Sequence, residues 1–168
     1  MTETVAEPKV LVLCYSQGGT TLGLCKKLAA AEGYELEEIK PVKPISKIGA
    51  FFKIPAIAAG KGVAVQDIAA NWNAYEKVVI AGPIWAGNPT PVLRGFFSQY
   101  PVKGKTVVGL LTCMGGAGAS TGQLRDMISL GGGKCEDVII ISGKDPAGKS
   151  LIEGNAPVTL EKLTAARI

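Results

Sequence analysis

The sequence predicts an α/β domain in which five parallel strands, in the doubly wound order 2-1-3-4-5, form a sheet with helices on both faces. Apolar runs rich in β-branched residues alternate with stretches of helical composition, which is typical of a parallel sheet with right-handed crossovers. The runs are nearly continuous, as expected for strands covered on both sides. The 168 residues are predicted to form a single domain, residues 1–168, with a flexible start at residues 1–8.

Five segments are predicted to be strands. Four of them are apolar runs of the kind that is buried inside a sheet: residues 9–15, 77–84, 106–111 and 137–142. The remaining segment, residues 34–40, is more polar and fits a strand at the edge of the sheet.

Helices are predicted between the strands and at the end of the chain: residues 20–32, 90–99, 121–130 and 157–167. The first begins with two threonines that can cap a helix and stops before Gly33. The second has a proline just inside its start, where the missing N–H is no loss. The third ends at three consecutive glycines.

Residues 41–75 fit this alternation least and are predicted to be an irregular, lysine-rich insert. The stretch PISKIGAFFKIPAIAAGKG has apolar residues at roughly helical spacing, and Pro55 is expected to break the helix. Every charged residue from Lys40 to Gln66 is a lysine. One interpretation is a helix that covers the sheet and exposes its lysines to water. The other is a docking surface at residues 43–61 for an acidic partner.

Composition excludes several kinds of site. The chain contains no histidine and its four cysteines form no Cys-x-x-Cys pair, so we predict no metal site. Catalysis by Ser-His-Asp or Cys-His groups needs an imidazole, and no catalytic residue is assigned. The net charge of +4 comes without an arginine-rich tract, so no nucleic-acid partner is expected.

The same composition indicates where the protein works. No apolar run reaches the roughly 18 residues of a membrane span. The first residues, MTETVAEPK, lack the basic and apolar regions of a signal peptide. Scattered single cysteines fit a reducing compartment. We therefore expect a cytoplasmic protein without a membrane span.

The first of three unusual loops follows the first predicted strand and opens the first helix. Its residues are Ser16, Gln17, Gly18, Gly19, Thr20 and Thr21. A helix N-terminus offers unpaired N–H groups and the positive end of the helix dipole, so it attracts an anion. Glycines let a phosphate approach the backbone closely, and the hydroxyls add donors. By itself, the loop would also fit a tight turn with a helix cap.

Two common phosphate-binding sequences do not fit this loop. A nucleoside triphosphatase loop needs Gly-Lys-Ser/Thr, and there is no lysine here. A dinucleotide-binding loop needs G-x-G-x-x-G after the first strand, which is absent. The sequence GAGAST at residues 116–121 imitates it, but after the fourth strand and without the third glycine.

Two more uncharged loops follow the third and fourth predicted strands. The second loop has a tryptophan between small residues, and its candidate site residues are Pro83, Ile84, Trp85, Ala86, Gly87 and Asn88. The third loop is glycine-rich, and its candidates are Thr112, Cys113, Met114, Gly115, Gly116 and Gly118. The tryptophan fits either a core position or a stacking role. The third loop fits either a plain surface loop or backbone contact with a flat polar ring.

The positions of the three loops strengthen the case for a site. In a doubly wound sheet of this order, ligands bind at the carboxyl ends of strands 1 and 3, where the winding reverses. The three loops follow strands 1, 3 and 4, and strand 4 neighbours strand 3. They are therefore predicted to meet in one crevice.

These loops resemble those of flavodoxin-like proteins. The family's phosphate loop reads roughly Ser/Thr-x-Thr-Gly-x-Thr and is matched by Ser16, Gly19 and Thr21, while Gly18 stands where the family usually has Thr. The stretch YEKVVIAGPIWAGNPTPVLRGFF resembles the third strand, flavin loop and third helix of a bacterial flavodoxin-domain group, and TCMGGAGAS resembles its third loop. The resemblance extends over residues 9–142.

The resemblance implies a flavodoxin-like fold and FMN as the cofactor, with the phosphate in the first loop and the isoalloxazine ring between the other two. Three features depart from typical electron-carrying flavodoxins. Those proteins are strongly acidic, whereas this chain has a pI near 8.9. The third loop has no aromatic residue to cover the second flavin face. The lysine-rich residues 41–62 have no counterpart in short-chain carriers.

Three functions follow from this resemblance. The favoured one is electron transfer to or from a redox partner protein, because at this length nearly every element belongs to the fold. The second is a small FMN-dependent NAD(P)H:quinone-type reductase, which needs the open flavin face that the third loop would leave. The third is a non-enzymatic interaction module with the basic insert as its surface.

Overall fold

The computed structural model describes residues 9–52, 54–114 and 116–142. A parallel sheet forms its central layer, with the order β2-β1-β3-β5-β6, and the predicted doubly wound order is confirmed. The strands of this order are β1 (Val10–Cys14), β2 (Glu35–Glu38), β3 (Lys77–Trp85), β5 (Thr106–Cys113) and β6 (Lys134–Ser142). A further short strand, β4 (Asn88–Pro89), pairs antiparallel with the end of β3.

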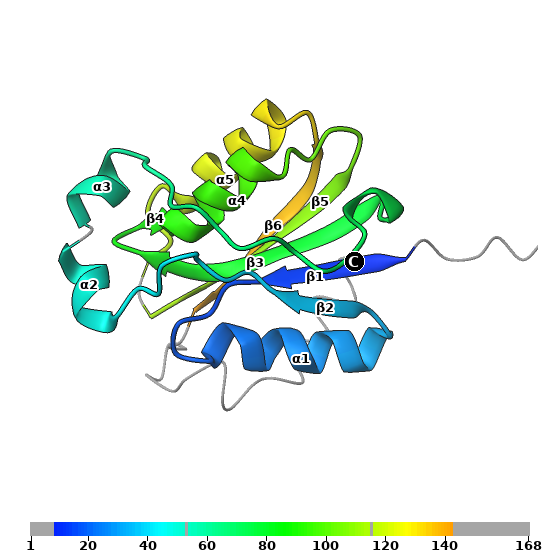
Figure 1. Ribbon diagram of the computed structural model, residues 1–168, viewed down its shortest axis with the longest axis horizontal. Helices are drawn as coiled ribbons and strands as arrows, with labels where there is room; N and C mark the ends of the chain where they lie inside the picture. Colours follow the sequence, from blue (N-terminus) through cyan, green and yellow to red (C-terminus); the bar gives the residue numbers. More distant parts are fainter. Residues whose placement is uncertain (1–8, 53, 115, 143–168) are drawn as a thin grey trace, which may run out of the picture.

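Helices cover both faces of the sheet. Figure 1 shows α1 (Thr20–Glu32) on one face and α4 (Pro91–Gln99) with α5 (Ser120–Leu130) on the other. The bounds of all three agree with the predicted helices to within one residue. The helix predicted at residues 157–167 and the flexible start predicted at residues 1–8 lie outside the described residues.

The sheet separates two apolar layers. On one side, Leu28 of α1 packs in a cluster that includes Val79 of β3. On the other side, Phe96 of α4 and Leu124 of α5 pack in a cluster that includes Ile80 of β3. Because successive strand residues face opposite layers and both layers are apolar, the strand sequences are apolar without interruption. Full burial of one such side chain stabilises the fold by roughly 1.5–3 kcal/mol.

The central strands extend further toward the predicted site than the sequence indicates. β3 continues through Trp85 and turns back into β4, so the second loop is a hairpin. β5 includes Thr112 and Cys113, the first two residues of the predicted third loop. The reason is pairing: Pro83 is in register with Thr112 across the β3–β5 ladder, and beyond this point β3 pairs with β4.

At the opposite end of the sheet, β6 begins at Lys134, three residues before the predicted start. The register between β5 and β6 shifts between Val107 and Val108, which are paired with Cys135 and Asp137. The two strands therefore stay paired through an irregularity that an apolar pattern does not reveal.

The lysine-rich insert forms short elements rather than one helix. Its elements are α2 (Lys47–Phe52), α3 (Ile54–Ala58) and a 3₁₀ turn, η1 (Trp72–Ala74). Figure 1 places α2 and α3 beyond the carboxyl ends of the strands, so the helix predicted to cover the sheet is wrong. Pro55 lies in the first turn of α3, where a proline is tolerated.

The rest of the insert is held against the body of the domain by backbone contacts. The Val63 N–H donates to the Pro91 carbonyl at 3.0 Å, at the start of α4. Pro41 and Val65 form an isolated antiparallel bridge, so the part of the insert that contains α2 and α3 leaves and returns at the same place. None of the helices in the described part of the chain is long and apolar enough to cross a membrane.

Candidate functional site

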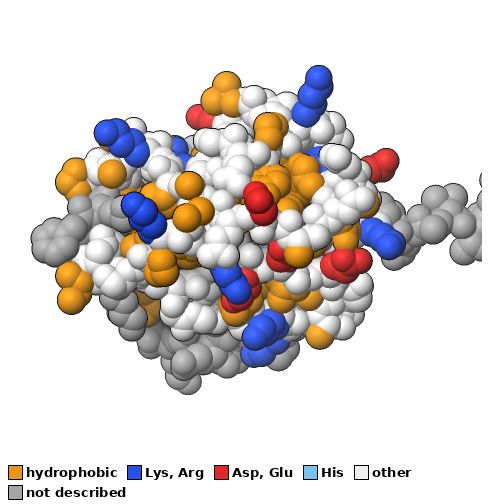
Figure 2. All heavy atoms as spheres, in the orientation of Figure 1, with side chains coloured by type: hydrophobic (Ala, Val, Ile, Leu, Met, Phe, Trp, Pro, Cys, Tyr) orange, Lys and Arg blue, Asp and Glu red, His pale blue; other side chains and the backbone are white. Residues whose placement is uncertain are grey.

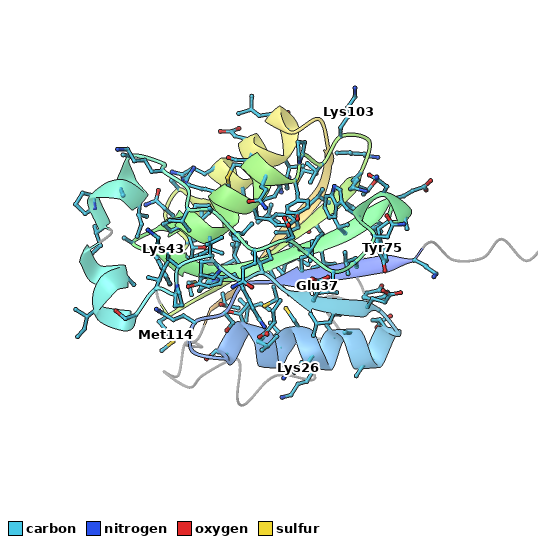
Figure 3. The ribbon with its side chains drawn as sticks, viewed as in Figure 1. Lys26, Glu37, Lys43, Tyr75, Lys103 and Met114 are labelled. Carbon is cyan, nitrogen blue, oxygen red and sulfur yellow. The ribbon has the colours of Figure 1, made fainter. Side chains whose placement is uncertain are left out.

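The three uncharged loops meet at the carboxyl edge of the sheet and line one pocket of about 300 Å³. The lining combines residues of all three: Ser16, Gln17, Gly18, Thr20, Thr21, Pro83, Ile84, Trp85, Thr112, Cys113 and Met114. No Lys, Arg, Asp or Glu is among these described lining residues. Figure 3 shows Met114 at the end of the molecule where β1 and β3 finish.

The other predicted site residues shape the loops and do not line the pocket. These are Gly19, Ala86, Gly87, Asn88, Gly116 and Gly118. Gly115 lies outside the described residues. The structure thus separates the predicted residues that face the pocket from those that lie elsewhere in the three loops.

The N-terminus of α1 provides unpaired donors. Gly19 is the N-cap, and no side chain caps the helix. A backbone hydrogen bond of 2.8 Å runs from the Gly23 N–H to the Gly19 carbonyl; the N–H groups of residues 20–22 precede it and have no partner within the helix. The Gly19 N–H donates to Ser16 Oγ at 3.0 Å, which fixes the loop. Together these groups suit an anion.

A buried hydroxyl pair joins the first loop to the end of β5. Thr21 Oγ1 and Thr112 Oγ1 lie 2.7 Å apart, and both side chains are buried. In such a pair one hydroxyl donates and the other accepts, so only one of the two protons remains for a ligand. The structure therefore gives Thr21 a connecting role in addition to the donor role predicted from the sequence.

Trp85 is half-buried at the end of β3 and lines the pocket. Its ring contacts Tyr15 edge-on, with ring centroids 5.9 Å apart and an angle of 72° between the planes. Tyr15 is buried, and this burial raises the pKa of its phenol. The tryptophan thus has one edge on the core and another part at the pocket, and its stacking role stays a prediction.

The hairpin turn after Trp85 packs directly on the third loop. Ala86 and Gly87 both have positive φ, 49° and 73°, as a tight two-residue hairpin turn requires. The Ala119 N–H donates to the Gly87 carbonyl at 2.9 Å. A Cβ at Gly118 would lie 2.6 Å from the Gly87 Cα, so this close contact requires glycine.

A series of hydrogen-bonded polar side chains connects the same turn to α4 and α5. Asn88 Nδ2 donates to the Ala86 carbonyl at 2.7 Å, and Gln123 Nε2 donates to Asn88 Oδ1 at 2.8 Å. Arg94 Nη2 in turn donates to Gln123 Oε1 at 2.5 Å. Arg94 Nε is buried with no hydrogen-bond partner among the described residues, and burial lowers the Arg94 pKa. This polar chain links α4 and α5 to the turn.

Sequence reasoning missed three residues that support the pocket. Tyr15 immediately precedes the first loop, and an aromatic residue at a strand end was an available signal. Arg94 and Gln123 lie inside helices, at positions that no motif distinguishes. Their role depends on contacts between residues about 30 positions apart in the sequence.

Comparison with known proteins finds similarity in structure. No protein-family model matches the chain, and no curated protein matches its sequence. A Bacteroides eggerthii protein provisionally described as a flavoprotein is 24% identical, with a TM-score of 0.73 over 96% of this chain and 99% of that chain. A Lactobacillus acidophilus flavoprotein solved in complex with FMN is 20% identical, with a TM-score of 0.69 over 79% and 93%. Two-electron reduced Megasphaera elsdenii flavodoxin is 18% identical, with a TM-score of 0.55 over 94% and 97%.

The chain has the flavodoxin-like fold. In this flavodoxin-like domain the pocket lies at the carboxyl ends of β1 and β3, where the winding of the sheet reverses. A fold does not specify a function, so the function is argued from the residues of the pocket.

Proposed function

We propose that the protein binds FMN in this pocket and transfers electrons to or from a partner protein. The observation that supports it most is the union of three uncharged loops around one pocket, with the N-terminus of α1 on one side and Trp85 on another. The flavodoxin-like fold and the FMN complex of a structural neighbour agree with it.

The first loop suits the phosphate of FMN. The backbone N–H groups of residues 20–22 and the hydroxyls of Ser16 and Thr20 supply donors. No carboxylate lines the pocket among the described residues. A dianionic phosphate would be held by the helix dipole and by neutral donors rather than by a lysine or arginine.

The second and third loops suit a flat ring with one polar edge. Trp85 and Ile84 offer apolar surface from the hairpin, and Cys113 and Met114 offer it from the end of β5. Peptide groups of these loops can hydrogen-bond to the polar edge. When bound, FMN would supply the redox chemistry, while the chain orients it, excludes water and determines which edge is exposed.

The described elements favour a carrier over a reductase. Nearly all described residues belong to the sheet, its covering helices or the insert, and the described pocket lining contains no Lys or Arg to hold the phosphates of a nicotinamide cofactor. The reductase alternative has one supporting observation: Met114 is exposed and no aromatic residue of the third loop lines the pocket, so one ring face would be accessible.

The first experiment identifies the cofactor. Purified protein should be yellow, heating should release FMN, and the apoprotein should rebind FMN saturably with quenching of flavin fluorescence. Release of mainly FAD, or the absence of saturable FMN binding, would disprove the proposal.

A second experiment separates carrier from reductase. The oxidised flavoprotein is mixed anaerobically with NADH or NADPH, and flavin absorbance is followed. We expect no rapid bleaching, with reduction only through a partner reductase. Rapid bleaching by either nucleotide would replace the carrier with the reductase.

A further inference from the structure

Exposed apolar side chains gather beside the pocket. Of the five large hydrophobic side chains that are exposed in the described part of the chain, four belong to the insert or to the third loop. They are Val42, Ile48, Ile54 and Met114, with exposures of 55%, 73%, 39% and 68%. We call these four residues the rim patch. The fifth, Leu130, lies at the end of α5.

Contacts of the insert and of Met114 place the rim patch beside the pocket. Gln17 lines the pocket and donates from Nε2 to the Ile45 carbonyl at 2.7 Å, which fixes the chain between Val42 and Ile48 to the first loop. α3, which begins with Ile54, contacts β4 of the hairpin. Met114 itself lines the pocket. The patch therefore lies beside the pocket, where electrons would enter or leave.

In the part of the insert that carries Val42, Ile48 and Ile54, residues 41–66, the charged residues have one sign. No acidic residue occurs between Glu38 and Asp67, whereas the same stretch contains five lysines. Lys43 and Lys61 are exposed, and neither takes part in the salt bridges found among the described residues. On the face drawn in Figure 2, hydrophobic and basic side chains cover the α2 and α3 end, and the acidic ones lie elsewhere.

We propose that the rim patch docks an acidic redox protein whose own electron-transfer site has an apolar centre and a ring of carboxylates. This inference rests on the proposed function, and it assigns the partner a charge opposite to that of this surface. Complementary charges steer the encounter and fix its orientation. The exposed apolar side chains then exclude water at the centre of the contact, and a methionine such as Met114 adapts to different partner shapes.

Other occupants fit the patch less well. A symmetric contact with a second copy would place the same lysine-rich surfaces opposite each other, with repulsion between them. An amphipathic helix that lies in a lipid surface needs a continuous apolar face. α2 and α3 have six and five residues, and Ile57 of α3 is turned into the protein core.

The test uses electron transfer from a reduced plant-type [2Fe–2S] ferredoxin, a small acidic protein, to the FMN-loaded protein in a stopped-flow instrument. One electron passes from each reduced cluster to the flavin. We expect the second-order rate constant to fall about ten-fold or more when the salt concentration rises from about 10 mM to about 300 mM. A rate that is independent of salt, or that rises with it, would overturn the proposal.

Matched variants locate the effect. Lys43→Glu with Lys61→Glu should lower the rate at low salt by about ten-fold and abolish its salt dependence. Lys103→Glu with Lys134→Glu makes the same change in net charge on other exposed lysines. Figure 3 shows Lys103 at the opposite end from Lys43. Equal losses in the two pairs would overturn the assignment to the rim patch. Binding of the wild-type protein to phosphatidylserine vesicles would also overturn the proposal if Lys43→Glu with Lys61→Glu abolished that binding. The surface would then be assigned to lipid.

The FMN affinity of every protein is measured in parallel. If the wild-type protein does not bind FMN, the proposed function fails. The docking surface is then tested on the apoprotein by fluorescence anisotropy of labelled ferredoxin. Salt-sensitive binding that depends on Lys43 and Lys61 would still support the docking surface, whereas its absence would overturn it.

Discussion

Trp85 lies at the boundary between the core and the pocket, so it can contact both Tyr15 and a bound ligand. Contact with Tyr15 stabilises the fold, whereas contact with a ligand ring would stabilise only the complex. Stacking of an aromatic side chain on a base-like ring is worth roughly 1–3 kcal/mol. We therefore expect Trp85→Ala to weaken FMN binding about ten-fold or more, measured by fluorescence titration of the apoprotein.

Two controls separate stacking from packing in this experiment. Trp85→Phe keeps an aromatic ring and should retain most of the affinity. Trp72→Phe alters the other tryptophan, which lies in η1 and packs against Phe96 and Tyr100, and should leave FMN binding unchanged. An unchanged affinity in Trp85→Ala, with the fold intact, would return Trp85 to a purely structural role.

Ala86 is the only described residue other than glycine with a positive φ. Its Cβ strains the backbone at φ 49°, and glycine would remove that strain. Ala86→Gly should raise the free energy of unfolding by about 0.5–1 kcal/mol, after allowance for the greater freedom of glycine in the unfolded chain. Gly87→Ala, at φ 73°, should lower it by about 1 kcal/mol. Urea denaturation measures both, and a destabilising Ala86→Gly would contradict the turn geometry.

Tyr75 connects the start of the sheet to the insert through its hydroxyl, which donates to a Glu35 carboxylate oxygen. This hydrogen bond raises the pKa of Tyr75 to about 12. Because the folded-state pKa lies above the ordinary value of about 10, the stabilisation is complete below pH 10 and is lost as the pH rises through 12. Glu35 is exposed, so solvent screening reduces the effect to about 1 kcal/mol.

The expected result is that Tyr75→Phe is less stable than the wild-type protein at pH 8 and that the difference shrinks from pH 10 upward. Urea denaturation at several pH values measures it. A difference that stays constant up to pH 12 would attribute the effect to packing of the buried ring instead of to the hydrogen bond.

At the scale of elements, the β3–β4 hairpin and the start of α5 form one unit through the contact of Gly87 with Gly118. A Cβ at Gly118 would lie 2.6 Å from the Gly87 Cα and carbonyl oxygen, so Gly118→Ala must push the two loops apart. We expect it to weaken FMN binding about ten-fold and to lower stability by about 1–3 kcal/mol, the usual cost of overpacking.

Gly116→Ala is the matched control, because a Cβ at Gly116 would have no atom within 4 Å and the residue is in the same loop. It should leave both stability and FMN affinity close to those of the wild-type protein. Equal effects of the two substitutions would show that the third loop needs glycine for flexibility and not for the contact with the hairpin.

At the scale of the whole molecule, the absence of acidic residues from the described pocket lining bears on redox potential. A carboxylate within a few Å would repel an anionic reduced flavin by roughly 1–4 kcal/mol. Without one, and with the lysine-rich insert nearby, the second one-electron reduction should be easier than in acidic flavodoxins. The two one-electron potentials should therefore lie close together, which favours transfer of electrons in pairs.

Stepwise reductive titration tests this prediction, because it measures the yield of one-electron-reduced protein. Met114→Glu introduces a carboxylate at the pocket and should lower the second potential by some tens of millivolts, given about 59 mV for each ten-fold change in a one-electron equilibrium. Met114→Gln serves as the uncharged control. A high yield of one-electron-reduced wild-type protein, or no difference between the two variants, would disprove the electrostatic explanation.

The layers of the fold and the position of the pocket could be predicted from the amino-acid sequence. The end of α1 was predictable because it depends on a neighbouring residue, Gly33, which caps the helix. Its start was also placed correctly, but the expected threonine cap is wrong: Gly19 is the N-cap and no side chain caps the helix. The buried strands were predictable because burial on both faces leaves an uninterrupted apolar run. The uncharged loops were recognised because each directly follows such a run, and the rules of doubly wound sheets place their ends together.

The residues that hold the pocket walls could be identified only from the folded arrangement. The Thr21–Thr112 hydrogen bond, the Gly87–Gly118 contact and the polar chain from Arg94 each join residues about 30 to 90 positions apart. The extension of β3 into a hairpin depends on its pairing with β4. The insert lies at the end of the sheet because its backbone bonds to Gln17 and Pro91 instead of packing as one amphipathic helix. Such features depend on the partner that each group meets in space, and local patterns carry no information about that partner.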